Sequence, residues 1–323
     1  MKTEFEFIQN IKEKYGLTKV GDDCAVLPKD DETDMVITAD LLVEDIDFRL
    51  EWTTPEFLGH KALAVSLSDI AAMGAVPQWA MLSIGIPEEL WASDFLEQFY
   101  ESANRTTIKF RVFGMDGIVG GDISRSPDKL VIDSIVGGVV PKGQAIMRSG
   151  AKVGDAIFVT GELGGAAAGL RLLSEGHRYP EENGPRYDSL LLRQLTPYAS
   201  IPSGIFLREE RIASAMIDLS DGLSSDLNHI CQASGVGAKV NSESLPIHGK
   251  LKRIFRDPEE QLDMALNGGE DFELLFTVPK EKKPLVENLP VTQIGEITSN
   301  TGIIELVRDG KTEILEPKGY RHF

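Results

Sequence analysis

The feature that most constrains the fold is an alternation of strand-like and helix-like segments along all 323 residues. Alternating or short apolar runs predict strands at 34–40, 78–86, 129–139, 155–160, 214–219, 272–278 and 291–297. Helical periodicity predicts helices at 55–73, 93–109, 164–174, 187–195 and 222–233, and a Gly-containing turn predicts a hairpin over 303–317. This alternation favours the α/β class, with a segregated α+β arrangement as the alternative.

The segment 141–154 interrupts this pattern because it combines a proline, three glycines and several charged residues. A chain of this length also exceeds what one hydrophobic core normally supports. We therefore predict two domains, one over 1–143 and one over 144–323.

The charge balance limits the partners of the protein. The sequence contains 33 Lys and Arg residues and 51 Asp and Glu residues, which gives a net charge of −18. This charge argues against nucleic acid and against an anionic membrane surface as partners. The N-terminal segment is a charged amphipathic helix rather than a signal peptide, and no apolar run is long enough to span a membrane. Cys24, Cys231 and the five His match no zinc or redox spacing. We expect a cytoplasmic protein.

The common phosphate-binding and hydrolase motifs do not fit. A GxxxxG run spans 164–169, but Leu170 and Arg171 follow where a P-loop needs Lys and Ser or Thr. The run is better interpreted as a strand-to-helix turn with small residues for close packing. The protein-kinase motif set and the GxSxG nucleophile elbow are missing from the sequence.

The remaining chemical candidates are aspartates beside Gly, Ser or Thr at the ends of predicted elements. Each one alone could be a helix cap or an Asx-turn. One of them, Asp69, instead lies within an apolar helical stretch, where an unpaired carboxylate would be costly. If the aspartates converge, their repulsion calls for divalent cations, and oxygen ligands favour Mg²⁺. Such a site could hold nucleotide phosphates through the metal, as in phosphoryl transfer.

The order of the motifs resembles that of the thiamine-monophosphate kinases over essentially the whole chain. The motifs are GDDCAV (21–26), TADLLVEDIDF (38–48), VSLSDIAAMGAVP (65–77), VGGDISRS (119–126), RSGAKVGDAIFVTG (148–161), MIDLSDGLSSDL (216–227), GGEDFELLFT (268–277) and PKGYRHF (317–323).

The resemblance implies two α/β domains, of which the N-terminal one binds metal and nucleotide and pairs its sheet with that of a second chain in a homodimer. It implies direct transfer of the γ-phosphoryl group of ATP, with Mg²⁺, onto thiamine monophosphate. The implied metal ligands are Asp23, Thr38, Ala39 (by its carbonyl), Asp40, Asp69, Asp122, Asp218 and Asp221. Asp40 and Asp122 are the implied catalytic residues. Tyr100, Gly121, Asp122, Arg148 and Ser220 would contact the nucleotide, and Asp47, Glu270 and Tyr320 the thiamine end.

This chain departs from the family pattern at four positions. Asp122 stands where Asn is expected, Tyr320 where Trp is common, and Asp45 and Asp47 where Gly and His are usual. The alternative interpretations are a surface role for Arg148, a core role for Tyr100 and an exposed loop position for Asp47. The alternative functions are another ATP-dependent synthetase of the same superfamily and a binding protein without activity.

Overall fold

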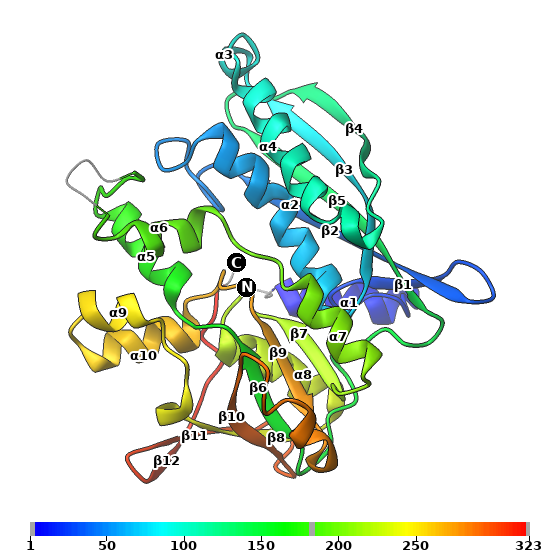
Figure 1. Cartoon of the computed structure of the whole chain (residues 1–323), viewed down its shortest axis with the longest axis vertical. Helices are drawn as coiled ribbons and strands as arrows, with labels where there is room; N and C mark the ends of the chain where they lie inside the picture. The colour runs from blue at the N-terminus through cyan, green and yellow to red at the C-terminus, as the bar shows by residue number, and fades with distance from the viewer. Residues whose placement is uncertain (1–3, 181–184, 321–323) are drawn as a thin grey trace.

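The computed structural model describes residues 4–180 and 185–320. The chain forms a mixed α/β fold with two β-sheets, one in the upper part of Figure 1 and one in the lower part. Most strand pairs are antiparallel, and the two parallel pairs are β3 with β4 and β8 with β11. A regular βαβ alternation would give mainly parallel pairs, so the strand pairing is closer to the α+β alternative than to the α/β class.

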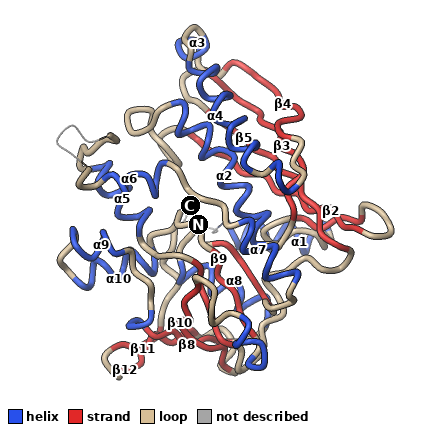
Figure 2. Tube along the Cα trace, viewed as in Figure 1, coloured by secondary structure: helices blue, strands red, loops and turns tan. Residues whose placement is uncertain are grey.

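The first sheet has the strand order β1-β2-β5-β3-β4. Its strands are β1 (Ala25–Pro28), β2 (Thr33–Val43), β3 (Val76–Ile86), β4 (Gly117–Arg125) and β5 (Val131–Pro141). The helices of this half are α1 (Glu4–Tyr15), α2 (Pro55–Ala72), α3 (Glu88–Trp91) and α4 (Phe95–Lys109), followed by a 3₁₀ turn, Arg111–Phe113. Figure 2 shows α2 and α4 on one side of this sheet.

Helix α2 begins where the sequence predicts. The Thr54 side chain accepts a hydrogen bond from the Phe57 N–H at 3.3 Å, and Pro55 occupies the first helical position, where its missing N–H costs nothing. The helix is buried on almost every side because it contacts α4, α7, β2, β5 and β7. This position between the two halves explains a helix that is apolar all round.

The second sheet has the order β12-β11-β8-β10-β6-β9-β7. Its strands are β6 (Ala156–Thr160), β7 (Ala215–Asp218), β8 (Gly237–Asn241), β9 (Leu274–Val278), β10 (Val291–Thr298), β11 (Ile304–Arg308) and β12 (Lys311–Ile314). The helices around it are α5 (Gly165–Ser174), α6 (Asp188–Leu195), α7 (Ile201–Glu209), α8 (Leu223–Ser234), α9 (Gly249–Ile254) and α10 (Pro258–Asn267), with 3₁₀ turns at Ser242–Ser244 and Lys280–Leu285.

The structure contains every long element that the sequence predicts, including the C-terminal hairpin, formed by β11 and β12. The sequence patterns missed β1, β4 and β8, and helices α3, α7, α9 and α10. The segment 141–154 lies between the last strand of the first sheet and the first strand of the second. The division at 143 stays a prediction, because one hydrophobic core joins α2 to α7, β7 and β9 across it.

One face of the first sheet, which we call the open face, carries apolar side chains that α2 and α4 do not cover. Gly138 faces α2, since a Cβ there would meet Ile70, whereas Gly137 lies against the Trp79 ring on the opposite face. The buried residues of β2, β3 and β5 alternate with half-buried ones on that opposite face. The open face is defined by Ile37, Trp79, Met81, Ile135 and Val139.

Within the described residues, no helix combines the length and apolar character that a membrane crossing requires.

Candidate active site

An acidic cluster lies at the junction of the two halves of the chain. Its five residues come from four segments: Asp23 from the loop before β1, Thr38 and Asp40 from β2, Asp69 from α2, and Asp218 from the end of β7. Carboxylate oxygens of Asp23, Asp69 and Asp218 all lie within 4.8 Å of one another. The structure therefore brings these five predicted ligands together.

The alternation of β2 explains why Thr38 and Asp40 enter this cluster. Residues two apart on a strand share a face, and here that face contacts α2. The Thr38 hydroxyl donates a short hydrogen bond to Asp69, and the Ser66 hydroxyl, also from α2, donates to Asp40 at 2.6 Å. The strand β1 pairs with β2 only as far as Ile37, so in the described chain no strand flanks the outer edge of β2 at Thr38 and Ala39.

Arg148 is the cation beside this cluster. Its guanidinium forms an ion pair with Asp23 at 2.6 Å, and its backbone N–H donates to Asp22 at 2.9 Å. Arg148 is half-buried, with one fifth of its side chain exposed. The interpretation of Arg148 as a surface residue of a linker is therefore wrong.

The cluster holds more negative charge than one arginine can neutralise. Burial, with the charge of Asp23 next, raises the pKa of Asp218 to about 8, and burial and Asp40 raise the pKa of Asp69 well above its usual range. Asp23 Oδ2 and Asp218 Oδ2 are buried, and no hydrogen bond to either is found among the described residues. Buried unpaired carboxylate oxygens at this spacing fit a divalent cation with oxygen ligands.

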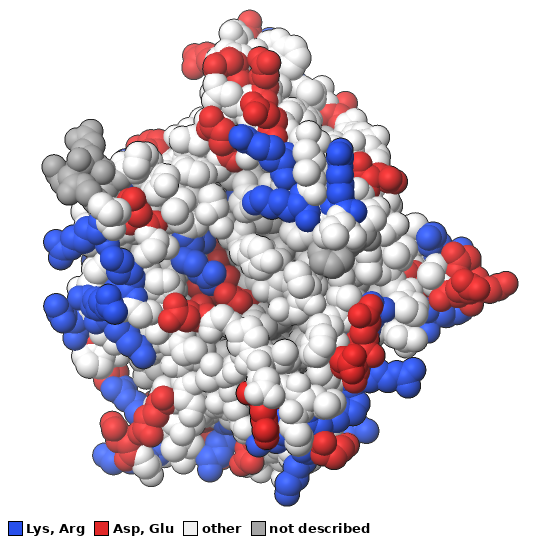
Figure 3. All heavy atoms as spheres, in the orientation of Figure 1, with Lys and Arg blue, Asp and Glu red and all other residues white. Residues whose placement is uncertain are grey.

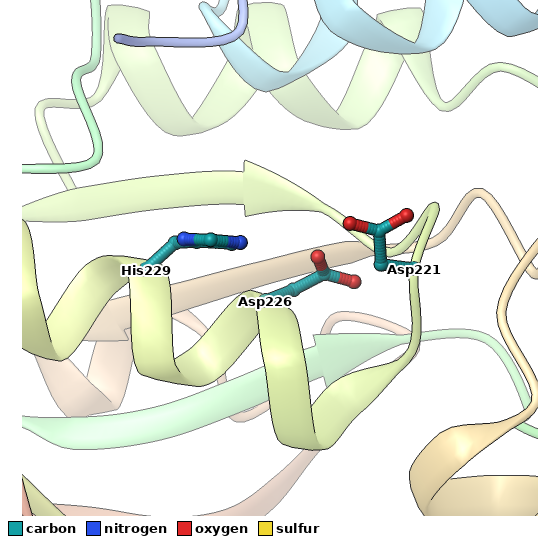
Figure 4. A group of neighbouring side chains, drawn as sticks. All are labelled: Asp221, Asp226 and His229. Carbon is teal, nitrogen blue, oxygen red and sulfur yellow. The ribbon is translucent and has the colours of Figure 1, made fainter. Parts of the chain in front are cut away.

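A second acidic group adjoins the first and includes a residue type that the sequence did not suggest. Asp221, Asp226 and His229 point toward one another from the loop before α8 and from α8 itself (Figure 4), with ligand atoms within 4.8 Å. Asp226 also accepts the Gly222 N–H at 3.0 Å. Burial lowers the pKa of His229 to about 4, so the ring is neutral at pH 7. Asp226 and His229 lie on successive turns of α8, a spacing that could have indicated this group.

A cleft of about 490 Å³ opens beside the acidic cluster. Its walls are the β2 end and the following loop, helices α2, α5 and α6, the loops at 220–221 and 268–272, and Tyr320. Figure 3, in the orientation of Figure 1, shows acidic side chains, with basic ones beside them, in a hollow near the middle of the molecule. The predicted residues that line the cleft are Asp40, Asp47, Ser220, Asp221, Glu270 and Tyr320.

The C-terminal tail reaches this cleft because it is fixed on the start of α8. The backbone N–H groups of Lys318 and Gly319 donate to the Ser224 and Ser225 hydroxyls at 3.2 and 3.1 Å, and the Tyr320 N–H donates to the Asp221 carbonyl at 3.0 Å. Burial and the charges of nearby acids, Asp47 first, raise the pKa of the Tyr320 hydroxyl. The tail residues after Tyr320 lie outside the described residues.

Asp47 has a local structural task as well as a place in the cleft. Its carboxylate accepts the Val43 N–H at 2.8 Å and so closes the turn that follows β2. The residue is half-buried, which contradicts the interpretation as a fully exposed loop position. Asp45, in the same turn, is exposed, forms an ion pair with Lys129, and has a φ of 71°.

Two residues that the sequence analysis missed hold Glu270. Lys61 of α2 forms an ion pair with Glu270 at 2.7 Å, and the Gln194 amide of α6 donates a short hydrogen bond to its other oxygen. Both residues line the cleft and are buried. Lys61 lies in the same apolar helical stretch as Asp69, and a charged residue there is itself a signal.

The structure does not bring Tyr100, Gly121 and Asp122 to the cluster within one chain. Asp122 pairs with Ser83, then Asp133, then Leu41 across the sheet, and paired residues project to the same face. Asp122 therefore lies on the face opposite Asp40, and three strands away from it, a distance of about 14 Å.

Tyr100 is half-buried on α4, contacts Phe99 edge-to-face at 5.6 Å, and packs against the core, as the alternative interpretation predicts.

The glycine-rich turn at 161–169 is not available to a phosphate in this structure. Asp271 occupies the start of α5, where its carboxylate accepts the N–H groups of Gly164 and Ala166 at 2.6 and 3.1 Å. A Cβ at Gly169 would lie 2.2 Å from the Leu190 carbonyl, so close packing against α6 requires glycine there. These contacts support the interpretation as a strand-to-helix turn.

Comparison with known proteins identifies the family. Residues 21–140 match the AIR synthase related protein, N-terminal domain, and residues 152–307 match the corresponding C-terminal domain. The chain is 38% identical to the thiamine-monophosphate kinase of Bacillus subtilis (strain 168), over 94% of this chain and 93% of that relative. It is 39% identical to the thiamine-monophosphate kinase of Escherichia coli (strain K12), over 94% and 91%.

A solved structure described as AaThiL complexed with AMPPCP and TMP superposes with a TM-score of 0.86 at 36% identity, over 99% of this chain and 97% of that one. A crystal structure of thiamine monophosphate kinase from Aquifex aeolicus has a TM-score of 0.82 at 34% identity, over 98% and 100%. The chain therefore belongs to the thiamine-monophosphate kinase family.

Proposed function

We propose that this protein transfers the γ-phosphoryl group of ATP to the phosphate of thiamine monophosphate, forming thiamine diphosphate and ADP. The observation that carries the proposal is the buried acidic cluster at one end of a cleft of about 490 Å³, in a chain without a P-loop lysine. The names of the relatives and the AMPPCP and TMP of the AaThiL complex support the same reaction.

The proposed metal is Mg²⁺, held by oxygen atoms of Asp23, Thr38, Asp40, Asp69 and Asp218, with Asp221 and the Ala39 carbonyl beside them. When bound, such ions neutralise phosphate charge and orient the transferred group. The buried, unpaired oxygens of Asp23 and Asp218 support this assignment.

The chain's own residues then supply position and charge. Arg148, already adjacent to Asp23, adds a fixed positive charge for the nucleotide phosphates, and Ser220 at the cleft wall offers a hydroxyl. Asp40, held by the Ser66 hydroxyl, lies both in the cluster and in the cleft wall, where the acceptor phosphate must approach. In the transfer, a bond forms between an acceptor phosphate oxygen and the γ-phosphorus, and the bond from that phosphorus to the β,γ-bridging oxygen breaks.

The thiamine end of the substrate lies, in this proposal, farther along the cleft. Glu270, Asp47 and Tyr320 line that part of it. Thiamine carries a cationic thiazolium ring and an amine on its pyrimidine, so carboxylates suit both the charge and the donor. Tyr320 is 46% exposed, and an aromatic ring at the cleft wall suits stacking on a flat heterocycle.

The proposal extends to a homodimer formed through the open faces of the first sheets. Trp79, Met81 and Ile135 on this face are apolar and only half-buried in one chain, and burying them against a second chain is favourable. Asp122 lies on this face, and Gly121 precedes it on the edge strand β4. They and Tyr100 would serve a nucleotide site only from a second chain, so their proposed roles depend on the dimer. Light scattering on the wild type and on Met81→Asp tests this point.

The test of the activity is direct. The purified protein is incubated with ATP, Mg²⁺ and thiamine monophosphate, and thiamine diphosphate is measured by mass spectrometry, with ADP release in parallel. The alternative synthetase activities are tested with aminoimidazole precursors and selenide as acceptors. ATP hydrolysis without thiamine diphosphate, or turnover with another acceptor only, would overturn the proposal, and nucleotide binding without any turnover would indicate a binding protein.

A further inference from the structure

The cleft contains a buried cation that the proposed reaction does not use. Lys61 is 5% exposed, and it lies beside the apolar Leu58 and Val65 in the cleft wall. Its Nζ is 2.7 Å from Glu270 Oε1. Removing an ammonium group from water is costly unless a partner of opposite charge and good geometry compensates for it. Glu270 is that partner.

Glu270 is held from three directions. Lys61 and Gln194 bind its two carboxylate oxygens, and its backbone N–H donates to the Ser220 carbonyl at 2.8 Å. Its φ of 56° lies in the left-handed region, which a residue with a Cβ adopts only when its surroundings compensate for the strain. A strained backbone and two fixed donors leave the carboxylate of Glu270 little freedom.

The contacts cross the junction of the two halves. Lys61 belongs to α2, which packs on the first sheet, whereas Glu270 and Ser220 belong to loops of the second half. The remaining exposed part of Glu270, 30% of its side chain, faces the cleft. The cleft walls also carry Asp40, Asp47 and Asp221, so Lys61 is a cation in an acidic setting.

We infer that Lys61 is a positioning residue that holds the Glu270 carboxylate fixed toward the thiamine end of the substrate. The inference rests on the proposed function and deepens it. Because the Lys61–Glu270 pair is neutral as a unit, the buried ammonium does not repel the cationic thiazolium, while Glu270 still offers lone pairs to the substrate. Lys61 itself touches no substrate atom in this arrangement.

Lys61→Met tests the inference, because it keeps an unbranched side chain of nearly the same length and removes the charged terminal group. Glu270 contributes binding far from the transferred phosphoryl group, so its effect falls on KM rather than on kcat. We expect KM for thiamine monophosphate to rise about tenfold or more. The values of kcat and of KM for ATP should stay within about threefold of the wild type.

A double-mutant cycle with Glu270→Gln separates positioning from direct contact. If Lys61 acts through Glu270, the double variant has the same KM for thiamine monophosphate as Glu270→Gln alone. The inference is overturned if the increases in KM for thiamine monophosphate of the two single variants multiply in the double variant. It is also overturned if Lys61→Met leaves this KM unchanged or lowers kcat alone. The exposed Lys142, substituted by Met, is the matched control and should behave as wild type.

Lys61→Gln keeps the inference testable if Lys61→Met does not fold, since the amide can donate to Glu270 without carrying a charge. It is expected to raise KM for thiamine monophosphate, by less than Lys61→Met, with kcat retained; an unchanged KM overturns the inference. Wild-type turnover is measured first. A wild type that forms no thiamine diphosphate refutes the proposed function, whereas an active wild type with unaffected Lys61 variants refutes the role of Lys61 alone.

Discussion

Asp218→Asn should stabilise the metal-free protein and remove its response to Mg²⁺. Asp218 lies 2% exposed at the end of β7, with a carboxylate oxygen within 4.8 Å of those of Asp23 and Asp69. Two ionised carboxylates at that separation repel by about 3 kcal/mol at an effective dielectric constant of about 20. The asparagine keeps the shape of the side chain and removes its part of this repulsion.

The raised pKa of Asp218 gives a second measure of how much its negative charge destabilises the metal-free protein. A pKa of about 8 in the folded protein, against an ordinary value of 3.8, disfavours folding by about 4 kcal/mol at pH 7 in the absence of metal. The side-chain amide of the variant also needs hydrogen-bond partners. We therefore expect the free energy of unfolding of the Asp218→Asn variant to exceed that of the wild type by about half of this amount, about 2 kcal/mol. That corresponds to a rise in Tm of about 4–8 °C.

The assay is thermal unfolding followed by circular dichroism at pH 7, in a chelator and in millimolar Mg²⁺. In the chelator the variant should melt above the wild type. Mg²⁺ at about 100 times its Kd should stabilise the wild type by about 2.7 kcal/mol and leave the variant almost unchanged. The difference in Tm between variant and wild type should therefore shrink or change sign.

Asp34→Asn is the matched control for this measurement. Asp34 of β2 is also a buried carboxylate, but it accepts the Gly143 N–H at 2.7 Å and lies outside the cluster. Its variant should not gain stability in the chelator and should keep the Mg²⁺ response. A lower Tm for Asp218→Asn in the chelator, or a full Mg²⁺ response, would refute the reasoning.

Three further predictions test other parts of the site. Asp40→Asn should lower kcat for thiamine diphosphate formation by about 100-fold or more while the far-ultraviolet spectrum is unchanged, and near wild-type kcat at saturating Mg²⁺ would exclude a catalytic role. Asp47→Ala should raise KM for thiamine monophosphate by about tenfold with KM for ATP little altered, whereas the exposed Asp45→Ala should leave both constants unchanged in the same steady-state assay. The metal-free protein should lose stability as pH rises from about 4 to 8, because Asp218 binds its proton more tightly when folded; that contribution is complete below pH 4 and is lost as pH passes about 8. Chemical denaturation in a chelator across this pH range measures it, and a flat or rising profile contradicts the assignment.

The sequence predicts those members of the acidic cluster whose direction is set by the local strand or helix pattern. The alternation of β2 places Thr38 and Asp40 on one face, and Asp69 stands out because a carboxylate is rare within an apolar helix. The same reasoning applied to Lys61, six residues into α2 from Pro55, identifies a second buried charge that needs a partner. What the sequence could not show is that the partner is Glu270, about 200 residues away, since tertiary packing alone decides that contact.

The position of Asp122 depends on strand register, which local pattern does not determine. The stretch at 117–125 is rich in glycine and largely exposed, so it lacks the apolar alternation that would predict a strand. It nevertheless forms β4 at the edge of the sheet, parallel to β3. A shift of one residue in this register would move Asp122 to the face of Asp40, so only the structure distinguishes the two placements.

Helix α2 explains why metal binding and substrate recognition should respond separately to substitution. Lys61, Val65 and Asp69 recur every fourth residue, so they lie along one side of the helix, with about 12 Å between the first and last Cα atoms. Asp69 lies in the metal cluster, Lys61 holds Glu270, and Val65 lines the cleft between them. Because a buried helix is stiff, removing a charge at one end does not displace the other. Substitutions near Asp69 should therefore change kcat and the Mg²⁺ response, and those near Lys61 should change KM for thiamine monophosphate.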